Sequence, residues 1–500
     1  MIEGILIGLQ TALSFKNLMM VMIGCFSGTI IGMLPGLGPM TAIALMIPIT
    51  YGFDPSTGLI LMAGVYYGAV FGGSTSSILI NAPGVPGTVA TSFDGYPMAQ
   101  QGKAGKALAI AAYSSFAGGT ISAIFLLIAA PSLSLVSLSF RSPDYFGLMI
   151  LGLTAVAAFS SKGNFLKAMM MVVLGLMLAS VGQDTLSDIP RFTFDNMNLS
   201  DGISFVLVVM ATFAMSEALT IIFKANDPTK AAKQISLSQL GSIKLDKDET
   251  KKMVTTIPRS SVLGFLIGVL PGAGATIASF LAYGMERNFV NDEEKQKFGK
   301  GSVNGIAAPE TANNAACSGS FVPLLTLGIP GSGTTAVMLG ALLGFGIQPG
   351  PRLYQTNPEI FWSVIMSMYI GMVVLLILNL PLIPYIARVL ATPRTFLIPL
   401  ILFFSLTGVY LMSFNNFDIY MMIGIAVVAT VLRLYDFPMP PLILAFVLGG
   451  LMEENLRRSL LISDGSWSFM WDRPLTIVIM LTIIFIVGWQ IYKSFFKKKL

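Results

Sequence analysis

The chain has 500 residues, of which 54% are hydrophobic and only 11% are charged, and its formal net charge is +5. A typical soluble domain carries roughly 25% charged residues, so this composition excludes a string of water-soluble domains and predicts a polytopic membrane protein. The sequence contains no histidine, which removes the commonest general base, proton shuttle and metal ligand.

The N-terminus starts with Met1-Ile2-Glu3 and lacks the basic start of a signal peptide, so we expect the apolar stretch behind it to be retained. Segments of about 20 apolar residues can span a membrane. They occur at roughly 108–130, 145–181, 203–223, 357–390, 397–413, 419–434 and 474–492. Because some of these runs hold more than one helix, we expect an all-α polytopic membrane protein with about ten to twelve membrane segments.

A long polar segment near the middle of the chain, residues 224–259, is rich in lysine. An excess of Lys and Arg in a short loop favours the cytoplasmic side, and the basic tail Lys497-Lys498-Lys499 predicts the same side for the C-terminus. These features divide the chain into four parts. We expect a first transmembrane repeat at 1–223, a Lys-rich cytoplasmic linker at 224–259, a second transmembrane repeat at 260–455, and a C-terminal loop, last membrane helix and basic tail at 456–500.

An internal repeat supports this division. Residues 28–38 read GTIIGMLPGLG and residues 264–274 read GFLIGVLPGAG, a shared GxxIGxLPGxG at a spacing of 236. Further on, Gly84-Val85-Pro86-Gly87 is echoed by Gly328-Ile329-Pro330-Gly331 at a spacing of 244. Two ordered motifs that recur at nearly equal spacings indicate two copies of one structural unit.

The two copies are predicted to be inverted rather than parallel. In the second copy the arms around the motif, 256–270 and 275–289, would each be about 22 Å long as helices. This is shorter than the ~30 Å hydrocarbon core, and both outer ends are flanked by basic residues. We therefore expect a re-entrant hairpin that enters from the cytoplasm. The corresponding loop of the first copy, residues 51–57, has no positive charge, which favours the opposite orientation.

Pro-Gly pairs within apolar stretches break helices, and in a membrane such breaks persist only where they line a cavity or are buried in protein. Paired breaks at matching positions of two repeats point to the binding site of a transporter. The predicted substrate- and ion-binding residues are Pro35, Gly36, Gly38, Ser74, Thr75, Ser76, Asn81, Gly84, Gly87 and Thr88 in the first copy, and Pro271, Gly272, Gly274, Glu310, Asn313, Asn314, Ser318, Gly331, Ser332, Gly333 and Thr334 in the second.

These residues supply hydroxyls, amides and, at the start of half-helices, free backbone N–H groups, which together can bind an anion without Lys or Arg. Freed carbonyl oxygens would suit Na⁺, and we expect Asn81, Asn314 and Thr334 to contribute to its site. The alternative is that the small residues only let helices pack closely. Glu310 either shapes the site or caps a helix, and Glu217 is a second intramembrane carboxylate with a possible functional role.

The remaining charges are expected at the margins of the membrane. We interpret Asp94, Lys103 and Lys106 as loop residues. Anchors that extend from helix ends toward the interface are expected at Arg141, Asp144, Arg388, Arg394 and Arg433.

At its motifs the chain strongly resembles the large membrane subunit of the tripartite tricarboxylate transporter family. The matching stretches are GMLPGLGPMTAIALMIPITYG, GAVFGGSTSSILINAPGVPGTVATSFDGYPMAQQGKAGKAL, GVLPGAGA and APETANNAACSGSFVPLLTLGIPGSGTTAVMLGAL, and the resemblance runs from about residue 15 to 455. It implies a secondary transporter in a bacterial inner membrane that imports a citrate-like di- or tricarboxylate by symport with Na⁺ or H⁺. It also implies two partners, a small membrane subunit of about four helices and a periplasmic solute-binding protein. The absence of histidine favours Na⁺.

Other classes of function have less support from the sequence. An anion channel or a non-transporting membrane scaffold remains the alternative. The chain has no GxxxxGK[ST] loop for ATP, no basic stripe with interleaved aromatic residues for nucleic acid, and no nucleophile–base pair for catalysis. The two cysteines, Cys25 and Cys317, lack the CxxC spacing of a metal site. We therefore expect neither an enzyme nor a cofactor beyond the coupling cation.

Overall fold

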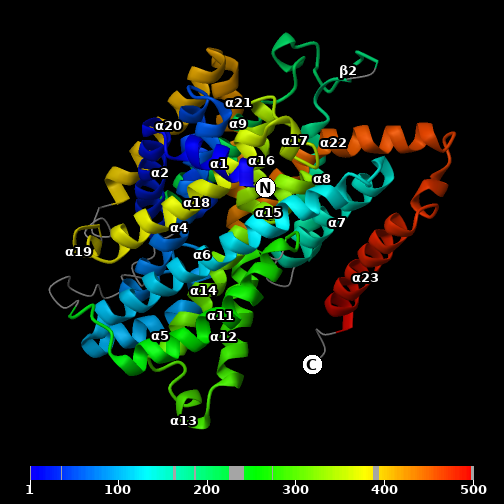
Figure 1. Ribbon diagram of the computed structural model, residues 1–500. Helices are drawn as coiled ribbons and strands as arrows, with labels where there is room; N and C mark the ends of the chain where they lie inside the picture. The colour runs from blue at the N-terminus through cyan, green and yellow to red at the C-terminus, as the bar shows by residue number, and fades with distance from the viewer. Residues whose placement is uncertain are drawn as a thin grey trace.

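The computed structural model describes residues 2–34, 36–160, 165–184, 187–224, 241–272, 274–386 and 394–496. These residues fold almost entirely into helices (Figure 1), with one short antiparallel strand pair, β1 (Gly182–Gln183) and β2 (Pro190–Arg191). Among them, seven helices are long and apolar enough to cross a membrane, and six shorter apolar helices accompany them. The all-α polytopic fold is confirmed. The total of ten to twelve membrane segments stays a prediction, because it depends on how many of the shorter helices cross.

The first half of the chain ends before the lysine-rich linker. Its helices are α1 Ile2–Ala12, α2 Phe15–Met33, α3 Gly38–Thr50, α4 Pro55–Ile80, η1 Pro86–Thr88, α5 Val89–Met98, η2 Ala99–Lys103, α6 Ala104–Ser137, α7 Ser142–Ser160, α8 Phe165–Ala179, η3 Met197–Leu199, α9 Phe205–Val209, η4 Met210–Met215 and α10 Ser216–Lys224. The turns η2 and η4 are π-helical, and α9, η4 and α10 follow one another without a break.

The second half has an order of helices that can be aligned with that of the first, as the predicted repeat requires. Its elements are α11 Lys247–Val269, α12 Gly274–Phe289, α13 Asp292–Lys295, α14 Val303–Gly319, α15 Phe321–Leu327, α16 Gly333–Gly344, α17 Leu353–Thr356, α18 Pro358–Asn379, α19 Ile383–Ile386, α20 Arg394–Ser413, α21 Asn416–Leu434, α22 Pro440–Ile462, η8 Trp467–Met470 and α23 Pro474–Phe496. The hairpin α2–α3 matches α11–α12, α4 matches α14–α15, α5 matches α16, and α6 matches α18. The helices α7, α8 and α9–α10 then match α20, α21 and α22.

The break after α4 shows that the spacing read from the second sequence motif is wrong by three residues. Asn81 ends α4 and Gly328 ends α15, both with left-handed backbone at φ 51° and 68°. Four residues later, Val85 and Ser332 are both extended and start the next helix. The equivalent positions are therefore 247 residues apart, not 244. The motif comparison failed because Pro-Gly occurs twice in the first break, and the second pair was matched in place of the first.

Close contacts between backbones recur at the corrected spacing. A Cβ added to Gly84 would lie 1.8 Å from the carbonyl oxygen of Gly32, and one added to Gly331 would lie 3.0 Å from that of Gly268. Gly32 and Gly268 occupy the same position of the repeated GxxIGxLPGxG motif. In both halves, therefore, the segment after the central helix lies on the first arm of the hairpin.

Glycines also let α2 and α4 pack with their backbones in contact. A Cβ at Gly28 would lie 2.3 Å from the carbonyl oxygen of Val65, and a Cβ at Gly72 would lie 2.1 Å from that of Thr29. Such small-residue contacts replace the hydrophobic effect as the source of helix association in a membrane. They place α4 at the centre of the molecule, where every residue from Ser56 to Leu79 is buried. Its counterpart α14 is buried along its whole length.

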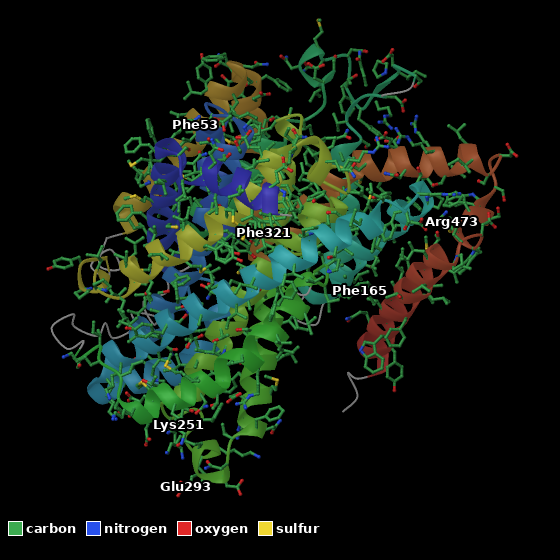
Figure 2. The ribbon with its side chains drawn as sticks, in the orientation of Figure 1. Phe53, Phe165, Lys251, Glu293, Phe321 and Arg473 are labelled. Atoms are coloured by element: carbon green, nitrogen blue, oxygen red, sulfur yellow. The ribbon has the colours of Figure 1, made fainter. Side chains whose placement is uncertain are left out.

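Helices of each half pack against helices of the other half. The central helix α4 contacts α18 of the second half, and α14 contacts α6 of the first. In the same way α22 packs on α7 and α8, while η4 and α10 pack on α21. Figure 2 shows Phe53, in the loop before α4, and Glu293, in the short helix α13 before α14, at opposite ends of the molecule. This placement is what an inverted repeat would produce, although the inversion itself stays a prediction.

The predicted linker is partly helical. Helix α11 begins at Lys247 with a capping box in which Asp246 and Glu249 bond each other's backbone N–H groups. At 23 residues α11 is about 35 Å long, longer than the arm expected from the sequence. Its partner α12 has 16 residues, about 24 Å, and is too short to cross a ~30 Å core as a straight helix. Residues 225–240 of the linker lie outside the described part of the chain.

Two acidic residues are not where the sequence placed them. Asp94, expected in a loop, lies fully buried in α5 and accepts backbone N–H groups of Gly301 at 2.9 Å and Ser302 at 2.7 Å. It therefore ties α5 to the start of α14. Asp144, expected at the interface, is fully buried at the start of α7, where Arg473 and Thr476 next to α23 donate to it. A carboxylate at the start of a helix accepts backbone N–H groups that have no partner within the helix. Asp94 does this at the start of α14, and Asp144 does it at the start of α7.

The lysines and arginines named with them also differ from expectation in part. Lys106 lies in α6 and pairs with Glu249 of α11 at 2.9 Å, so it is not a loop residue. Lys103 ends the π-helical turn η2. Arg141 is exposed directly before α7, while Arg388 lies outside the described residues.

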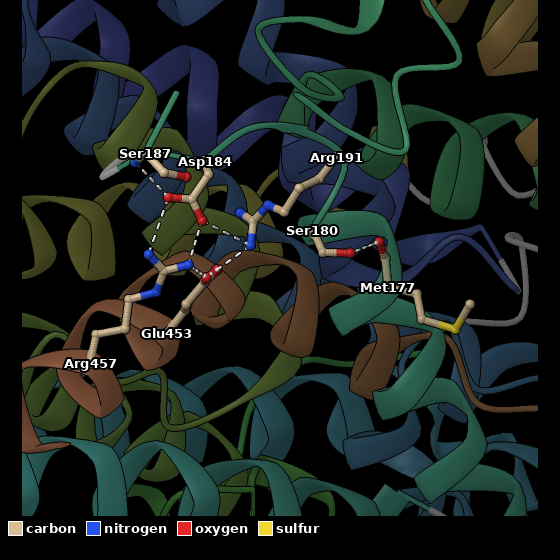
Figure 3. A network of polar contacts seen from close by, with 7 residues as sticks. All are labelled: Met177, Ser180, Asp184, Ser187, Arg191, Glu453 and Arg457. Atoms are coloured by element: carbon tan, nitrogen blue, oxygen red, sulfur yellow. Dashed lines mark hydrogen bonds and ion pairs between the residues drawn. The ribbon is translucent and has the colours of Figure 1, made fainter. Parts of the chain in front are cut away.

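An ionic network holds the segment between α8 and α9 on α22 (Figure 3). Arg191 of β2 pairs with Glu453 of α22 at 2.8 Å, and Arg457 of α22 pairs with Glu453 and with Asp184, which follows β1. These ion pairs between two carboxylates and two guanidinium groups fix the β1–β2 strand pair to the outer part of α22. This part of α22 projects from the helical body in Figure 1.

Candidate functional site

The tips of the two repeated hairpins have the same backbone geometry. After α2, Leu34 is extended and Gly36 has φ 97°. After α11, Leu270 is extended and Gly272 has φ 81°. Positive φ at these positions requires glycine, which is why the motif has Gly at both. The short second arms then start at Gly38 and Gly274, which both have positive φ. Pro35 lies outside the described residues, and Pro271 lies in the second turn.

Each tip contacts the broken segment that follows the central helix of its own half. The backbone N–H of Gly272 donates to the carbonyl of Gly331 at 3.0 Å. In the first half, a Cβ on Gly38 would lie 4.0 Å from the carbonyl oxygen of Gly84. The structure therefore brings together the tip and the break that the sequence had paired, in both repeats. We call the segments 81–88 and 328–335 the first and second crossover.

Glu310 joins the two halves. It lies fully buried in α14 and accepts hydrogen bonds from Ser74 of α4 at 2.7 Å, Thr91 of α5 at 2.5 Å and Ser115 of α6 at 2.8 Å. Hydrogen bonds to an ionised carboxylate contribute about 1.5–3 kcal/mol each. No Lys or Arg pairs with Glu310 among the residues that the structure describes. The carboxylate is therefore held by neutral hydroxyls and does not serve as a helix cap.

Asn313 presents an unused amide to the first crossover. Its side chain is 1% exposed, and neither its amide nitrogen nor its amide oxygen has a hydrogen-bond partner within the described part of the chain. A Cβ added to Gly87 would lie 2.4 Å from that amide oxygen, so only glycine lets the crossover come this close. A buried amide without partners is costly in a finished core, and it is the type of group that a polar ligand satisfies.

At the second crossover, the corresponding group is a tyrosine. Position 66 is equivalent to 313 at the spacing of 247, and the hydroxyl of Tyr66 lies 3.4 Å from the hydroxyl of Ser332. Ser332 caps α16 by accepting the N–H of Thr335, whose hydroxyl accepts the N–H of Ser332 in return. The neighbouring Tyr67 shares a hydrogen bond with Ser318 at 2.7 Å and stacks on Phe321. Each crossover is thus contacted by the central helix of the other half.

Helices begin at both crossovers. The first leads into η1 and α5, and the second leads into α16, whose first residues are Gly333 and Thr334. The N-terminus of a helix carries free N–H groups and a partial positive charge, and this combination favours anions. The hydroxyls of Ser77 and Thr88 bond each other at 2.7 Å and close the first crossover against α4. Ser76 donates to the carbonyl of Gly73, so its hydroxyl serves the helix.

The three residues expected to hold Na⁺ lie in different surroundings. Asn81 is exposed at the end of α4, whereas Asn314 and Thr334 are buried in α14 and α16. Asn314 donates its amide nitrogen to the carbonyl of Glu310 at 3.1 Å, and its amide oxygen has no partner among the described residues. No described hydrogen bond joins Asn81 to either of the others, so the shared site stays a prediction.

Glu217 lies beside the first tip. A Cβ on Gly36 would lie 2.9 Å from its carboxylate oxygen, and Arg433 of α21 forms an ion pair with it. Arg433 also donates to the carbonyl of Thr212 at 2.9 Å and lies over the ring of Phe213. Arg433 is therefore not an anchor that reaches toward the interface. It neutralises the carboxylate of Glu217, which faces the tip of the first hairpin.

The comparison with protein families shows which family the chain belongs to. Residues 18–444 match the model of the tripartite tricarboxylate transporter TctA family. The chain belongs to this family. It is 41% identical over 475 residues, 95% of this chain and 93% of the other, to a 52.8 kDa uncharacterized protein in the TAR-I ttuC' 3' region of Agrobacterium vitis. It is 43% identical over 212 residues, 42% of this chain and 87% of the other, to an uncharacterized protein in the TAR-II ttuC' 3' region of the same organism. No solved structure matches the chain.

Membership in the TctA family makes this chain a multi-pass membrane subunit of a tripartite tricarboxylate transporter, and the family is one of transporters rather than enzymes. The matched residues include both hairpins, both central helices and both crossovers. They also include all the residues predicted for the site.

Several residues at the TctA-family site were missed from the sequence. Thr91 lies on α5, three residues after Thr88, and Ser115 lies on α6, and nothing in their local sequence marks them as partners of Glu310. Tyr66 and Tyr67 could have been found, because a spacing of 247 aligns them with Asn313 and Asn314. The spacing of 244 concealed this match.

Proposed function

We propose that this TctA-family chain imports a di- or tricarboxylate across the bacterial inner membrane as a secondary active transporter. The two crossovers and the two hairpin tips form the substrate site, and a cation gradient drives uptake, with Na⁺ favoured over H⁺. The unpartnered amide of Asn313 carries this assignment, because it is 1% exposed and lies directly on the first crossover.

The substrate would be held mainly by neutral groups. The N-termini that follow the crossovers offer backbone N–H groups to carboxylate oxygens, and Asn313 and Ser332 offer side-chain donors. No Lys or Arg in the described part of the chain pairs with Glu310, and Arg433, beside the first tip, is already used by Glu217. A polyanion in this setting needs bound cations to offset its charge, which supports symport over unassisted entry.

We infer docking positions for the partners from the same topology. Helix α10 leads into the lysine-rich linker, so the other end of α9–α10 would face the periplasm together with residues 187–204. Two apolar side chains of this segment, Phe194 and Met197, are 85% and 89% exposed. We propose that the periplasmic solute-binding protein docks on this segment, because exposed apolar groups in a folded segment mark interaction surfaces. The small membrane subunit would pack on α21 or α23, whose apolar windows are only 22% buried.

The test is uptake in proteoliposomes that contain this chain and its small subunit, with the binding protein and a labelled carboxylate outside. An inward Na⁺ gradient should drive accumulation above the external concentration, and dissipating the gradient with a Na⁺ ionophore should abolish it. Equilibration without accumulation in any cation gradient would instead indicate an anion channel. No flux with any carboxylate that the binding protein captures would indicate a scaffold.

A further inference from the structure

A small cavity lies beside two of the hydroxyls that donate to Glu310, those of Ser74 and Ser115. It is lined by Phe71, Ser74, Thr75, Leu108, Ser115 and Asn379, together with two alanines of α6, and it has room for about one water molecule. Each of the polar residues that line it is at least 95% buried. The cavity lies between α4 and α6 of the first half and α18 of the second.

Three of the polar residues that line the cavity, Ser74, Ser115 and Asn379, offer oxygens that can accept. Ser74 and Ser115 both direct their hydroxyl protons at the same carboxylate oxygen of Glu310, at 2.7 and 2.8 Å. Because each hydroxyl donates once, its lone pairs remain for another partner. Asn379 donates its amide nitrogen to the carbonyl of Leu375 at 3.0 Å, and its amide oxygen has no partner among the described residues. The available groups are therefore oxygens that accept.

The carboxylate of Glu310 has no counterion among the described residues. Glu310 is fully buried, and no Lys or Arg in the described part of the chain forms an ion pair with it. When Glu310 is ionised, three hydroxyls stabilise the carboxylate but do not neutralise it. A buried charge without a counterion is costly, and a single positive charge in the adjacent cavity would balance it.

We propose that this cavity binds a small monovalent alkali cation, Na⁺ or Li⁺, through the oxygens of Ser74, Thr75, Ser115 and Asn379, with Glu310 supplying the balancing charge. Hard cations prefer neutral and anionic oxygen ligands of this kind, while Ca²⁺ takes six to eight oxygens that include several carboxylates. None of Asn81, Asn314 and Thr334, the positions expected from the sequence, lines this cavity.

The position suggests how a cation would affect the substrate site. Glu310 lies one helical turn before Asn313 and Asn314 on α14, and Asn314 donates to the carbonyl of Glu310. A cation beside Glu310 would link α4 and α6 to α14 and α18, and so fix Asn313 at the first crossover. This coupling rests on the proposed symport, whereas the cation site itself does not.

The experiment measures cation binding without transport. The purified full-length chain in detergent is heated at constant ionic strength while Na⁺, Li⁺ or K⁺ replaces choline. Na⁺ and Li⁺ should raise the unfolding temperature in a saturable way, and K⁺ should not. Asn379→Ala and the isosteric Thr75→Val should each raise the Na⁺ concentration for half-maximal stabilisation at least tenfold. Ser122→Ala is the matched control, because Ser122 is equally buried on α6 but bonds the carbonyl of Ala315.

An unchanged Na⁺ midpoint in both variants, or no stabilisation of the parent chain by Na⁺, would show that the cavity holds only water and would overturn the proposal. Uptake in proteoliposomes separates this failure from failure of the proposed function. Na⁺-driven uptake with unchanged midpoints refutes the cavity and leaves symport standing. Shifted midpoints without any carboxylate uptake support the cavity and refute the transport function.

Discussion

The hydrogen bond from Thr91 to Glu310 gives a quantitative test of how the two halves are joined. Thr91→Val keeps the shape of the side chain but removes the donor that lies 2.5 Å from one carboxylate oxygen. The other oxygen keeps Ser74 and Ser115. Because the acceptor is charged and buried, we expect Thr91→Val to lower the free energy of unfolding by about 2–3 kcal/mol.

The same change should cost less when the charge is absent. In Glu310→Gln the amide oxygen can replace the carboxylate oxygen that accepts from Ser74 and Ser115. The amide nitrogen then replaces the other oxygen and can donate to the hydroxyl of Thr91. Loss of this neutral hydrogen bond costs about 1 kcal/mol. The double-mutant cycle should therefore give a coupling energy of about 1–2 kcal/mol.

Unfolding by SDS in mixed micelles, followed by tryptophan fluorescence, measures the four free energies. Ser122→Ala in both backgrounds is the control, and its cost should agree between them within about 0.5 kcal/mol, since Ser122 bonds the carbonyl of Ala315 and not the carboxylate. An equal cost of Thr91→Val with and without the charge would show that Glu310 is not held by this hydroxyl, and the reasoning would fail.

Three further predictions concern packing, charge and pH. Gly28→Ala would place a Cβ 2.3 Å from a carbonyl oxygen of α4 and should destabilise by about 3 kcal/mol in SDS unfolding, while Gly424→Ala, with open space around it, should not destabilise. Arg433→Met should destabilise by about 3–5 kcal/mol because it leaves Glu217 unpaired, and adding Glu217→Gln should recover most of the loss in detergent-solubilised yield and stability. Partial burial alone would raise the pKa of Asp54, but an ion pair with a lysine of α2 and hydrogen bonds from the first turn of α4 outweigh it and lower the pKa. The stabilisation is therefore complete above the ordinary pKa of about 3.9 and is lost as pH falls through the lowered folded value, so Asp54→Asn should flatten the acid side of the thermal-stability profile.

Much of the architecture follows from short-range features of the sequence. The GxxIGxLPGxG motif located both hairpin tips, because Pro-Gly in an apolar stretch breaks a helix whatever surrounds it. Asn313 and Glu310 were found through their place in a polar stretch next to a break. The division into halves stays a prediction, and α11 begins inside the predicted linker.

Contacts between segments that are distant in the chain could not be predicted from the sequence. Asp94 looked like a loop residue because its neighbours are polar, and only the return of α14 beside α5 buries it. Asn379 ends an apolar helix, and its importance depends on the serines of α4 and α6 that face the same cavity. Such groupings are set by helix packing between the halves, which no local pattern encodes.

Accumulation of a labelled carboxylate by the parent chain, Asn313→Ala and Ser122→Ala, compared in one set of proteoliposomes with the same Na⁺ gradient, tests the central claim most directly. We expect the parent and Ser122→Ala to accumulate substrate equally, and Asn313→Ala to lose at least tenfold in uptake at low substrate while keeping its Na⁺-dependent thermal stabilisation. Normal uptake by Asn313→Ala would contradict the placement of the substrate at the crossovers.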